Sequence, residues 1–223
     1  MDKKLFAEAI AKFTAGAVMV GLLLFLPAGT IRYPNGWLLM AILFVPMFAA
    51  GLVMLAKSPA LLRSRLDARE KADAQKTVVA LSGLMFLAGF VAAGLDHRFG
   101  WSRMPGWVVA VGTALFLFSY LLYAEVLREN AYLSRTIKVQ EGQTVVDTGL
   151  YGIVRHPMYA TTIVLFLSMP LVLGSWVAFV IFLVYPPIIS KRIFNEEQLL
   201  ERELTGYREY KSCVRWKVIP FLW

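Results

Sequence analysis

Long segments without a charged side chain are the strongest constraint on how this chain folds. Five runs contain no Asp, Glu, Lys or Arg for 19 residues or more. They are residues 13–31, 33–56, 77–95, 104–124 and 156–190. Because about 20 mostly apolar residues cross the hydrocarbon core of a bilayer as a helix, these runs predict membrane-spanning helices.

The composition agrees with a membrane protein. Hydrophobic residues make up 58% of the chain, charged residues 17%, and the mean hydropathy is +0.61. Soluble domains carry about a quarter charged residues. We therefore predict an all-α, polytopic helical membrane protein with about five to six transmembrane helices and a C-terminal helical hairpin. The predicted spans are 13–31, 36–56, 77–95, 106–127, 158–173 and 176–190.

The first and the last spans need separate comment. The first apolar segment is too long for a signal peptide and shows no small-residue cleavage site, so it is interpreted as a transmembrane helix. The last two segments are separated only by Gly174-Ser175 and are short for full crossings, which predicts a tight hairpin that thins the bilayer or is partly buried in protein.

The positive charges predict the orientation. If the N-terminus is inside, the inside segments hold 20 of the 23 Lys and Arg residues, and the outside loops hold only Arg32, Arg98 and Arg103. This positive-inside bias places both termini in the cytoplasm, in a bacterial inner membrane or the endoplasmic reticulum. The bias and the anionic lipid of the inner leaflet account for the net charge of +8, so nucleic-acid binding is not expected.

Polar chemistry is concentrated in the C-terminal part, which predicts two functional regions. Residues 1–127 are N-terminal transmembrane helices, with a charged inside loop at 57–76 that is expected to be partly helical. Residues 128–223 are the expected functional core. It begins with a connection that has short β-like runs and turn signals at Glu141-Gly142 and Thr148-Gly149; long connections of this kind usually carry function.

The residues after the last span are expected to continue as a helix that ends near Gly206. Leu199, Leu200 and Leu204 give this helix an apolar stripe. The stripe is expected either to lie against the inner membrane surface or to cover the site.

Arg192 and Glu196 are the first candidate site residues. They are four positions apart, so a helix places them on one face, where they form either an ordinary ion pair or a functional pair. Arg192 lies just after an unbroken apolar run, and ionisable residues at membrane depth tend to face a protein interior or a watery cavity. Glu197 places a second negative charge beside Glu196, so a nearby cation is expected.

The second candidate is the stretch Val154-Arg155-His156-Pro157-Met158-Tyr159 at the start of the fifth span. Pro157 suits the first position of a helix, and free amides at that helix start can hold an anion. His156 is either a structural hydrogen-bonding group or a catalyst. Tyr151 and Tyr159 either flank a ligand or anchor the chain at the membrane surface. The single cysteine, Cys213, gives neither a disulfide nor a metal cluster, and no metal is expected.

Three motifs in this order carry a resemblance to a known family. The segment "GLYGIVRHPMY", the later "RIFNEEQLL" and the following "GYREYKSCVRWKVIPFLW" resemble the isoprenylcysteine carboxyl methyltransferase family, whose wider group includes the phospholipid methyltransferases. The upstream "ENAYLSRTIKVQEGQTVVDTG" fits as well. The resemblance covers residues 128–223; the earlier spans match only in hydropathy and in "SPALLRSRL".

The resemblance implies an S-adenosylmethionine-dependent methyltransferase with a cytoplasmic cofactor pocket. It implies that Glu196 contacts the cofactor and that Arg192 faces the methyl acceptor as the catalytic residue. The acceptor is implied to be lipophilic and to enter from the bilayer. The other residues implied to line the cofactor pocket are Gln140, Gln143, Thr144, Val145, Val146, Tyr151, His156, Pro157, Met158 and Tyr159.

The acceptor and some alternatives stay open at this point. A prenylcysteine-type carboxylate, a phospholipid amine and a small thiol or phenol all fit as acceptors. If the acceptor loses a proton, Arg192, Glu197 or His156 is the candidate to assist. The chain has Thr161 where the family often has glycine, and Pro157 where the related NADPH-dependent sterol reductases usually have asparagine. A reductase or a non-enzymatic membrane scaffold is the remaining alternative, and the sequence does not predict an oligomeric state.

Overall fold

The computed structural model describes residues 3–66, 73–130, 132–133 and 139–223, and within these ranges it contains helices and no β-strand. This confirms the predicted all-α class. The helices are α1 (Lys3–Ala28), α2 (Pro34–Lys57), α3 (Pro59–Leu66), α4 (Asp73–Phe99), α5 (Gly106–Glu129), the 3₁₀ turn η1 (Gly149–Gly152), α6 (Pro157–Leu173), α7 (Trp176–Phe182), α8 (Tyr185–Glu203) and α9 (Tyr207–Cys213).

Five helical segments are long and apolar enough to cross a membrane, and α6, with 17 residues, is a shorter apolar helix. This agrees with the prediction of five to six spans. The five segments are Lys4–Ala28, Pro34–Lys57, Lys76–Phe99, Gly106–Glu129 and Trp176–Glu203.

The last span differs from the prediction. The predicted segment 176–190 is instead a 28-residue unit made of α7 and α8, which continues to Glu203. A short break at Leu183-Val184 separates the two helices, and α8 then begins with two prolines in its first turn, where missing amide hydrogens are tolerated. Gly206 lies beyond the end of α8 with a φ of 85°, so the predicted stop falls in the turn to α9.

The connection before α6 also differs from the prediction. The expected β-like runs form no strand in residues 139–148, and the chain there is extended or turning before η1. A short isolated strand pair is only marginally stable, and the described residues offer these runs no partner. The turn signals are correct, because Gly142 and Gly149 have positive φ angles of 70° and 55°. The inside loop 57–76 contains α3, as expected; residues 67–72 lie outside the described part.

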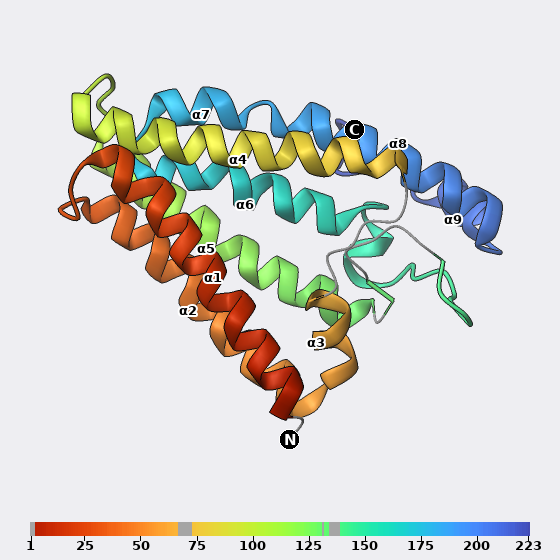
Figure 1. Ribbon diagram of the computed structural model, residues 1–223. Coiled ribbons are helices and arrows are strands. Elements are labelled where there is room, and N and C mark those ends of the chain that lie inside the picture. Colours follow the sequence, from red (N-terminus) through yellow and green to blue (C-terminus); the bar gives the residue numbers. More distant parts are fainter. Residues whose placement is uncertain (1–2, 67–72, 131, 134–138) are drawn as a thin grey trace.

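The helices pack as an elongated bundle in which α5 lies along α6, α1 along α4, and α7 and α8 along α4 (Figure 1). Close approach depends on small residues. A Cβ atom at Gly112 of α5 would lie 2.5 Å from Leu171 Cβ of α6, and one at Gly94 of α4 would lie 2.5 Å from the Leu24 carbonyl oxygen of α1. Small residues that let helix backbones approach are typical of membrane helix interfaces.

A buried carboxylate fixes the hairpin between α6 and α7. Asp96, at the end of α4, is only 2% exposed, and its Oδ2 accepts hydrogen bonds from Ser175 Oγ and Ser102 Oγ, both at 2.5 Å. Ser175 Oγ also accepts from the amide of Ala178 at 3.1 Å and so caps α7. The predicted turn at Gly174-Ser175 is therefore tied to α4, which holds the hairpin in place.

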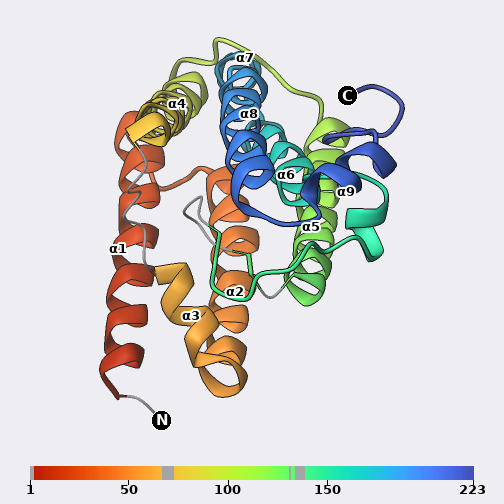
Figure 2. The same ribbon diagram turned by 90° about the vertical axis from the view of Figure 1, so that its right-hand side faces the viewer.

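The connections fall at two opposite ends of the bundle. The short turns at 29–33, 100–105 and 174–175 lie at one end, on the left of Figure 1. The connection that leads to η1, the start of α6, the end of α8 and α9 meet at the other end. Figure 2 views the molecule from that side and shows α9 following the end of α8. The polar residues of the C-terminal part are gathered there.

Candidate functional site

The start of α6 is held by the C-terminal segment. The amide of Arg155 donates to the Trp216 carbonyl at 2.9 Å, and the amide of His156 donates to the Lys217 carbonyl at 2.8 Å. The amides of Tyr159 and Ala160 donate to the His156 carbonyl at 3.0 and 3.1 Å. These four amides are therefore engaged within the protein, and the anion site that the sequence predicted at this helix start stays a prediction.

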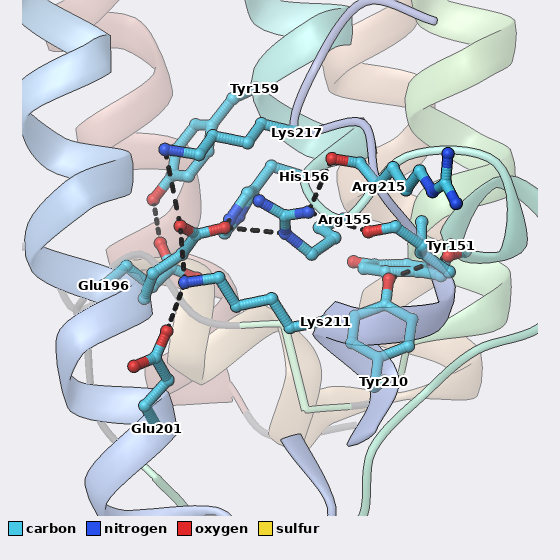
Figure 3. Close-up of polar contacts among 12 residues, drawn as sticks. Tyr151, Arg155, His156, Tyr159, Glu196, Glu201, Tyr210, Lys211, Arg215 and Lys217 are labelled. Atoms are coloured by element: carbon cyan, nitrogen blue, oxygen red, sulfur yellow. Dashed lines mark hydrogen bonds and ion pairs between the residues drawn. The ribbon is translucent and has the colours of Figure 1, made fainter. Parts of the chain in front are cut away.

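Glu197 is the centre of a buried ionic cluster. Its Oε1 accepts from Arg155 Nε at 2.7 Å and lies 3.2 Å from His156 Nε2, while its Oε2 lies 3.5 Å from Lys217 Nζ and 3.8 Å from Lys211 Nζ (Figure 3). Glu197 and His156 are each 4% exposed and Arg155 is 6% exposed. The cations expected near the glutamate pair are present, and the cluster joins α8, the start of α6 and the C-terminal segment.

Arg155 also binds this segment directly. Its Nη1 donates to the carbonyl oxygens of Val214 at 2.7 Å and Arg215 at 2.8 Å. A buried charge is costly to leave unpaired, so removing one member of the cluster would destabilise the others. The cluster therefore fixes the wall from which His156 and Tyr159 project.

Tyr159 connects the two residues that the sequence singled out on α8. Its hydroxyl donates to Glu196 Oε2, and Arg192 Nε donates to the same hydroxyl oxygen at 3.1 Å. Tyr159 is 3% exposed and Arg192 is 9% exposed. Arg192 and Glu196 are thus linked through an aromatic side chain from α6, rather than being only an exposed helical pair.

A pocket that is open to solvent on one side lies beside this triad at the end of the bundle. Small-molecule sites commonly combine apolar walls with a few polar groups. The lining residues are Asn130, Tyr132, Leu133, Gln143, Thr144, Val145, Val146, Tyr151, Arg155, His156, Met158, Tyr159, Glu196, Leu200, Leu204, Tyr207 and Tyr210.

Most of the residues implied by the family resemblance lie around this one pocket. They are Gln143, Thr144, Val145, Val146, Tyr151, His156, Met158, Tyr159 and Glu196. Gln140 and Pro157 are not among its lining residues. Gln140 instead closes the turn at 140–143, where its side chain donates to the Tyr132 carbonyl and its amide donates to Gln143 Oε1 at 2.9 Å. Pro157 is buried in the first turn of α6. The binding roles stay predictions.

Several pocket residues were not predicted. Arg155, Tyr207 and Tyr210 lie within motifs that the sequence analysis quoted, but their positions depend on contacts between distant parts of the chain. Leu200 and Leu204 belong to the apolar stripe that was expected to cover either the membrane or the site. They line the pocket, and Leu204 packs with Tyr207, Tyr210 and Val214 in a small apolar cluster.

Tyr151 forms a rigid part of the wall. Its hydroxyl accepts from Asn130 Nδ2 at 2.9 Å, and its carbonyl accepts from the Tyr210 hydroxyl at 2.7 Å. Burial raises the pKa of Tyr151 to about 12, so the phenol is neutral at physiological pH. The pocket therefore combines neutral aromatic walls with the carboxylate of Glu196.

The structure is thus a bundle of helices that are long and apolar enough to span a membrane, with a partly polar pocket at one end. Comparisons with known proteins add to this description. Residues 107–205, which run from α5 to the end of α8, match the family model described as phospholipid methyltransferase. This match confirms the resemblance to these methyltransferases that the sequence predicted, over the part of the chain that includes α6 and α8.

A solved structure supplies the fold comparison. It is described as the eukaryotic intramembrane Ras methyltransferase ICMT, isoprenylcysteine carboxyl methyltransferase, without a monobody. The likeness has a TM-score of 0.57 at 18% sequence identity and covers 92% of this chain and 74% of that chain. At this identity the likeness establishes the fold alone. No curated protein sequence matches the chain.

Proposed function

We propose that the protein transfers a methyl group from S-adenosylmethionine to a lipophilic acceptor at the end of the bundle that carries the pocket. The observation that carries the proposal is the arrangement around the Tyr159 hydroxyl. Glu196, on one side of it, lines the open pocket, while Arg192, on the other side, is buried between α6 and α8. One triad thus adjoins both a water-accessible site and the apolar bundle.

The pocket fits the chemistry of the cofactor. S-adenosylmethionine carries an ammonium group, a carboxylate, a sulfonium and an adenine ring. The Glu196 carboxylate can form a charge-assisted hydrogen bond with the ammonium. The rings of Tyr151 and Tyr159 and the aliphatic side chains of Val145 and Leu200 offer surfaces for the adenine. When bound, the cofactor supplies a methyl group that is already activated by its positive sulfur.

The protein's own contribution is mainly positioning. Aligning the donor and the acceptor removes much of the barrier of a two-molecule reaction. The Arg192 guanidinium can hold a carboxylate acceptor through a planar pair of hydrogen bonds and direct its oxygen toward the pocket. Because Arg192 is buried in the bundle, an acceptor that reaches it has to be compatible with apolar surroundings.

The position of Arg192 also bears on which acceptor is methylated and on whether that acceptor has to lose a proton. A prenylcysteine-type carboxylate needs no proton removal and suits Arg192, so it is the preferred acceptor. A phospholipid amine is the second candidate, because the matched family model is described as phospholipid methyltransferase. An amine, thiol or phenol has to lose a proton. Glu197 and His156 are bonded to each other within the ionic cluster, which favours a structural role for both.

The proposal includes an orientation. A charged, water-soluble cofactor has to reach the pocket from the aqueous side, and the predicted positive-inside bias places that side in the cytoplasm. Both termini then lie in the cytoplasm, and the lipophilic acceptor enters from the bilayer between the helices.

Binding of S-adenosylhomocysteine to Glu196→Gln tests the assigned role of this carboxylate. Loss of the charge that faces the ammonium should weaken binding about tenfold or more, measured by calorimetry in detergent. Glu201→Gln is the matched control: Glu201 lies on the same helix, pairs with Lys211 and does not line the pocket, so its affinity should stay near that of the wild type. Equal affinity of the Glu196→Gln variant and the wild type would refute the role of Glu196.

A further inference from the structure

Two tyrosines of α9, Tyr207 and Tyr210, differ in whether the hydroxyl group has a hydrogen-bond partner in the described structure. Tyr207 and Tyr210 are 4% and 7% exposed, their ring centres are 5.7 Å apart, and both line the pocket. The Tyr210 hydroxyl donates to the Tyr151 carbonyl at 2.7 Å. The Tyr207 hydroxyl is buried and has no hydrogen-bond partner among the residues that the structure describes. The pocket wall thus holds a polar group without a protein partner there.

An unpaired buried hydroxyl is unusual and needs an explanation. Buried polar side chains in native proteins are nearly always hydrogen-bonded, and leaving one unpaired costs free energy. Burial, followed by the charges of Glu197 and Glu196, raises the pKa of the Tyr207 phenol well above its ordinary value. The group therefore keeps its proton and is available as a hydrogen-bond donor.

We propose that the Tyr207 hydroxyl binds the α-carboxylate of the cofactor's amino-acid part. This inference rests on the proposed function. The α-ammonium and the α-carboxylate of an amino acid are attached to the same carbon, so a ligand whose ammonium pairs with Glu196 has its carboxylate close by. Tyr207 lines the same pocket as Glu196 and lies within the influence of its charge.

The surroundings favour a neutral donor for this carboxylate. Arg155, a cation among the residues that line the pocket, is already bonded to Glu197 and to two backbone carbonyls. Lys217 and Lys211 lie within 3.5 and 3.8 Å of Glu197. These positive charges offset the negative charge of Glu197. Neither Glu197 nor Glu196 accepts a hydrogen bond from the Tyr207 hydroxyl in the described structure, so this donor is available to a bound carboxylate.

The test is the substitution Tyr207→Phe in the full chain, with two readouts. Calorimetry should show that S-adenosylhomocysteine binds about tenfold or more weakly to the variant than to the wild type. Decarboxylated S-adenosylmethionine, which keeps the ammonium but lacks the carboxylate, should bind both proteins equally. Without ligand, the variant should have a Tm about 2–4 °C above that of the wild type, because an unsatisfied buried hydroxyl has been removed.

Tyr210→Phe is the matched control for stability. It removes a hydroxyl of the same chemistry from the same short helix, but that hydroxyl has a partner. The substitution leaves the Tyr151 carbonyl without its donor, so the Tm of the unliganded protein should fall. Opposite shifts of the Tm in the two variants distinguish an unpaired hydroxyl from a general effect of removing a phenol from α9.

The outcomes separate this inference from the proposed function. If the wild type binds S-adenosylhomocysteine and Tyr207→Phe binds it equally well, the inference is wrong and the proposed function stands. If Tyr207→Phe weakens binding of the decarboxylated compound as strongly, the hydroxyl contacts another part of the cofactor and the carboxylate assignment is wrong. A wild type that does not bind S-adenosylhomocysteine overturns both.

Discussion

At the scale of single residues, the structure assigns different positions to two adjacent glutamates. Glu197 is enclosed by Arg155, His156 and two lysines, whereas Glu196 lines the pocket and accepts a hydrogen bond from Tyr159. The sequence analysis left open whether His156 is structural or catalytic. Its ring bonds to Glu197 and its backbone to Lys217, and these contacts favour the structural interpretation.

The role proposed for Arg192 in binding the methyl acceptor predicts the effect of replacing this residue. The side chain lies outside the pocket lining and contacts Tyr159, so Arg192→Ala should leave binding of S-adenosylhomocysteine close to that of the wild type. Transfer of labelled methyl to a lipophilic acceptor should fall roughly 100-fold or more, because the acceptor is no longer aligned. Lys191→Ala, at an exposed neighbouring position, is the control and should stay active. Full activity of Arg192→Ala would exclude this role.

At the scale of helices, the interface between α5 and α6 positions the site, because α6 carries His156 and Tyr159 at its start. Gly112→Ala would place a Cβ atom 2.5 Å from Leu171 Cβ and should destabilise the protein by about 1–3 kcal/mol. Gly83→Ala in α4 meets no atom within 4 Å. It should be neutral or stabilising by up to about 1 kcal/mol, since alanine favours a helix. Thermal unfolding in detergent measures the stability of both variants. If both substitutions change the stability equally, close contact of α5 and α6 at Gly112 is not needed for stability.

The helices also show what the sequence can predict. The spacing of charged residues located the apolar part of each span, because desolvating a charge limits where a helix can cross. The ends were less predictable. α1 begins at Lys3 rather than near residue 13, since Lys12 and Glu8 form an ion pair at 2.6 Å on a helix that continues beyond the apolar run. The continuation of α8 to Glu203 was expected in part, but its break at residues 183–184 was not.

The site residues were predictable from the sequence only where they belong to motifs of the family that the chain resembles. Glu196, Tyr159 and the residues of the 143–146 run follow from the family resemblance, and they do surround one pocket. The role of the C-terminal segment follows from contacts over about 60 positions, such as that of Arg155 with the Arg215 carbonyl. Local periodicity contains no signal for such contacts. The same reason explains why Tyr207 was quoted within a motif but was not assigned a place.

At the scale of the whole molecule, the predicted orientation can be tested with the single native cysteine. Cys213 is exposed and lies at the end of α9, a helix whose Tyr207 and Tyr210 line the pocket. A membrane-impermeant maleimide should label it in inside-out vesicles and not in intact cells. Arg103→Cys in a Cys213→Ser background moves the thiol to the opposite end of the bundle, where labelling should be reversed. Labelling of Cys213 from the outside would contradict a cytoplasmic site.

The most direct test of the central claim is a calorimetric titration of the purified wild-type protein, in detergent or nanodiscs, with S-adenosylhomocysteine and, separately, with NADPH. The pocket, with the Glu196 carboxylate beside aromatic walls, predicts micromolar binding of S-adenosylhomocysteine and no binding of NADPH. Binding of NADPH without binding of S-adenosylhomocysteine would contradict the proposed methyl transfer and favour a reductase.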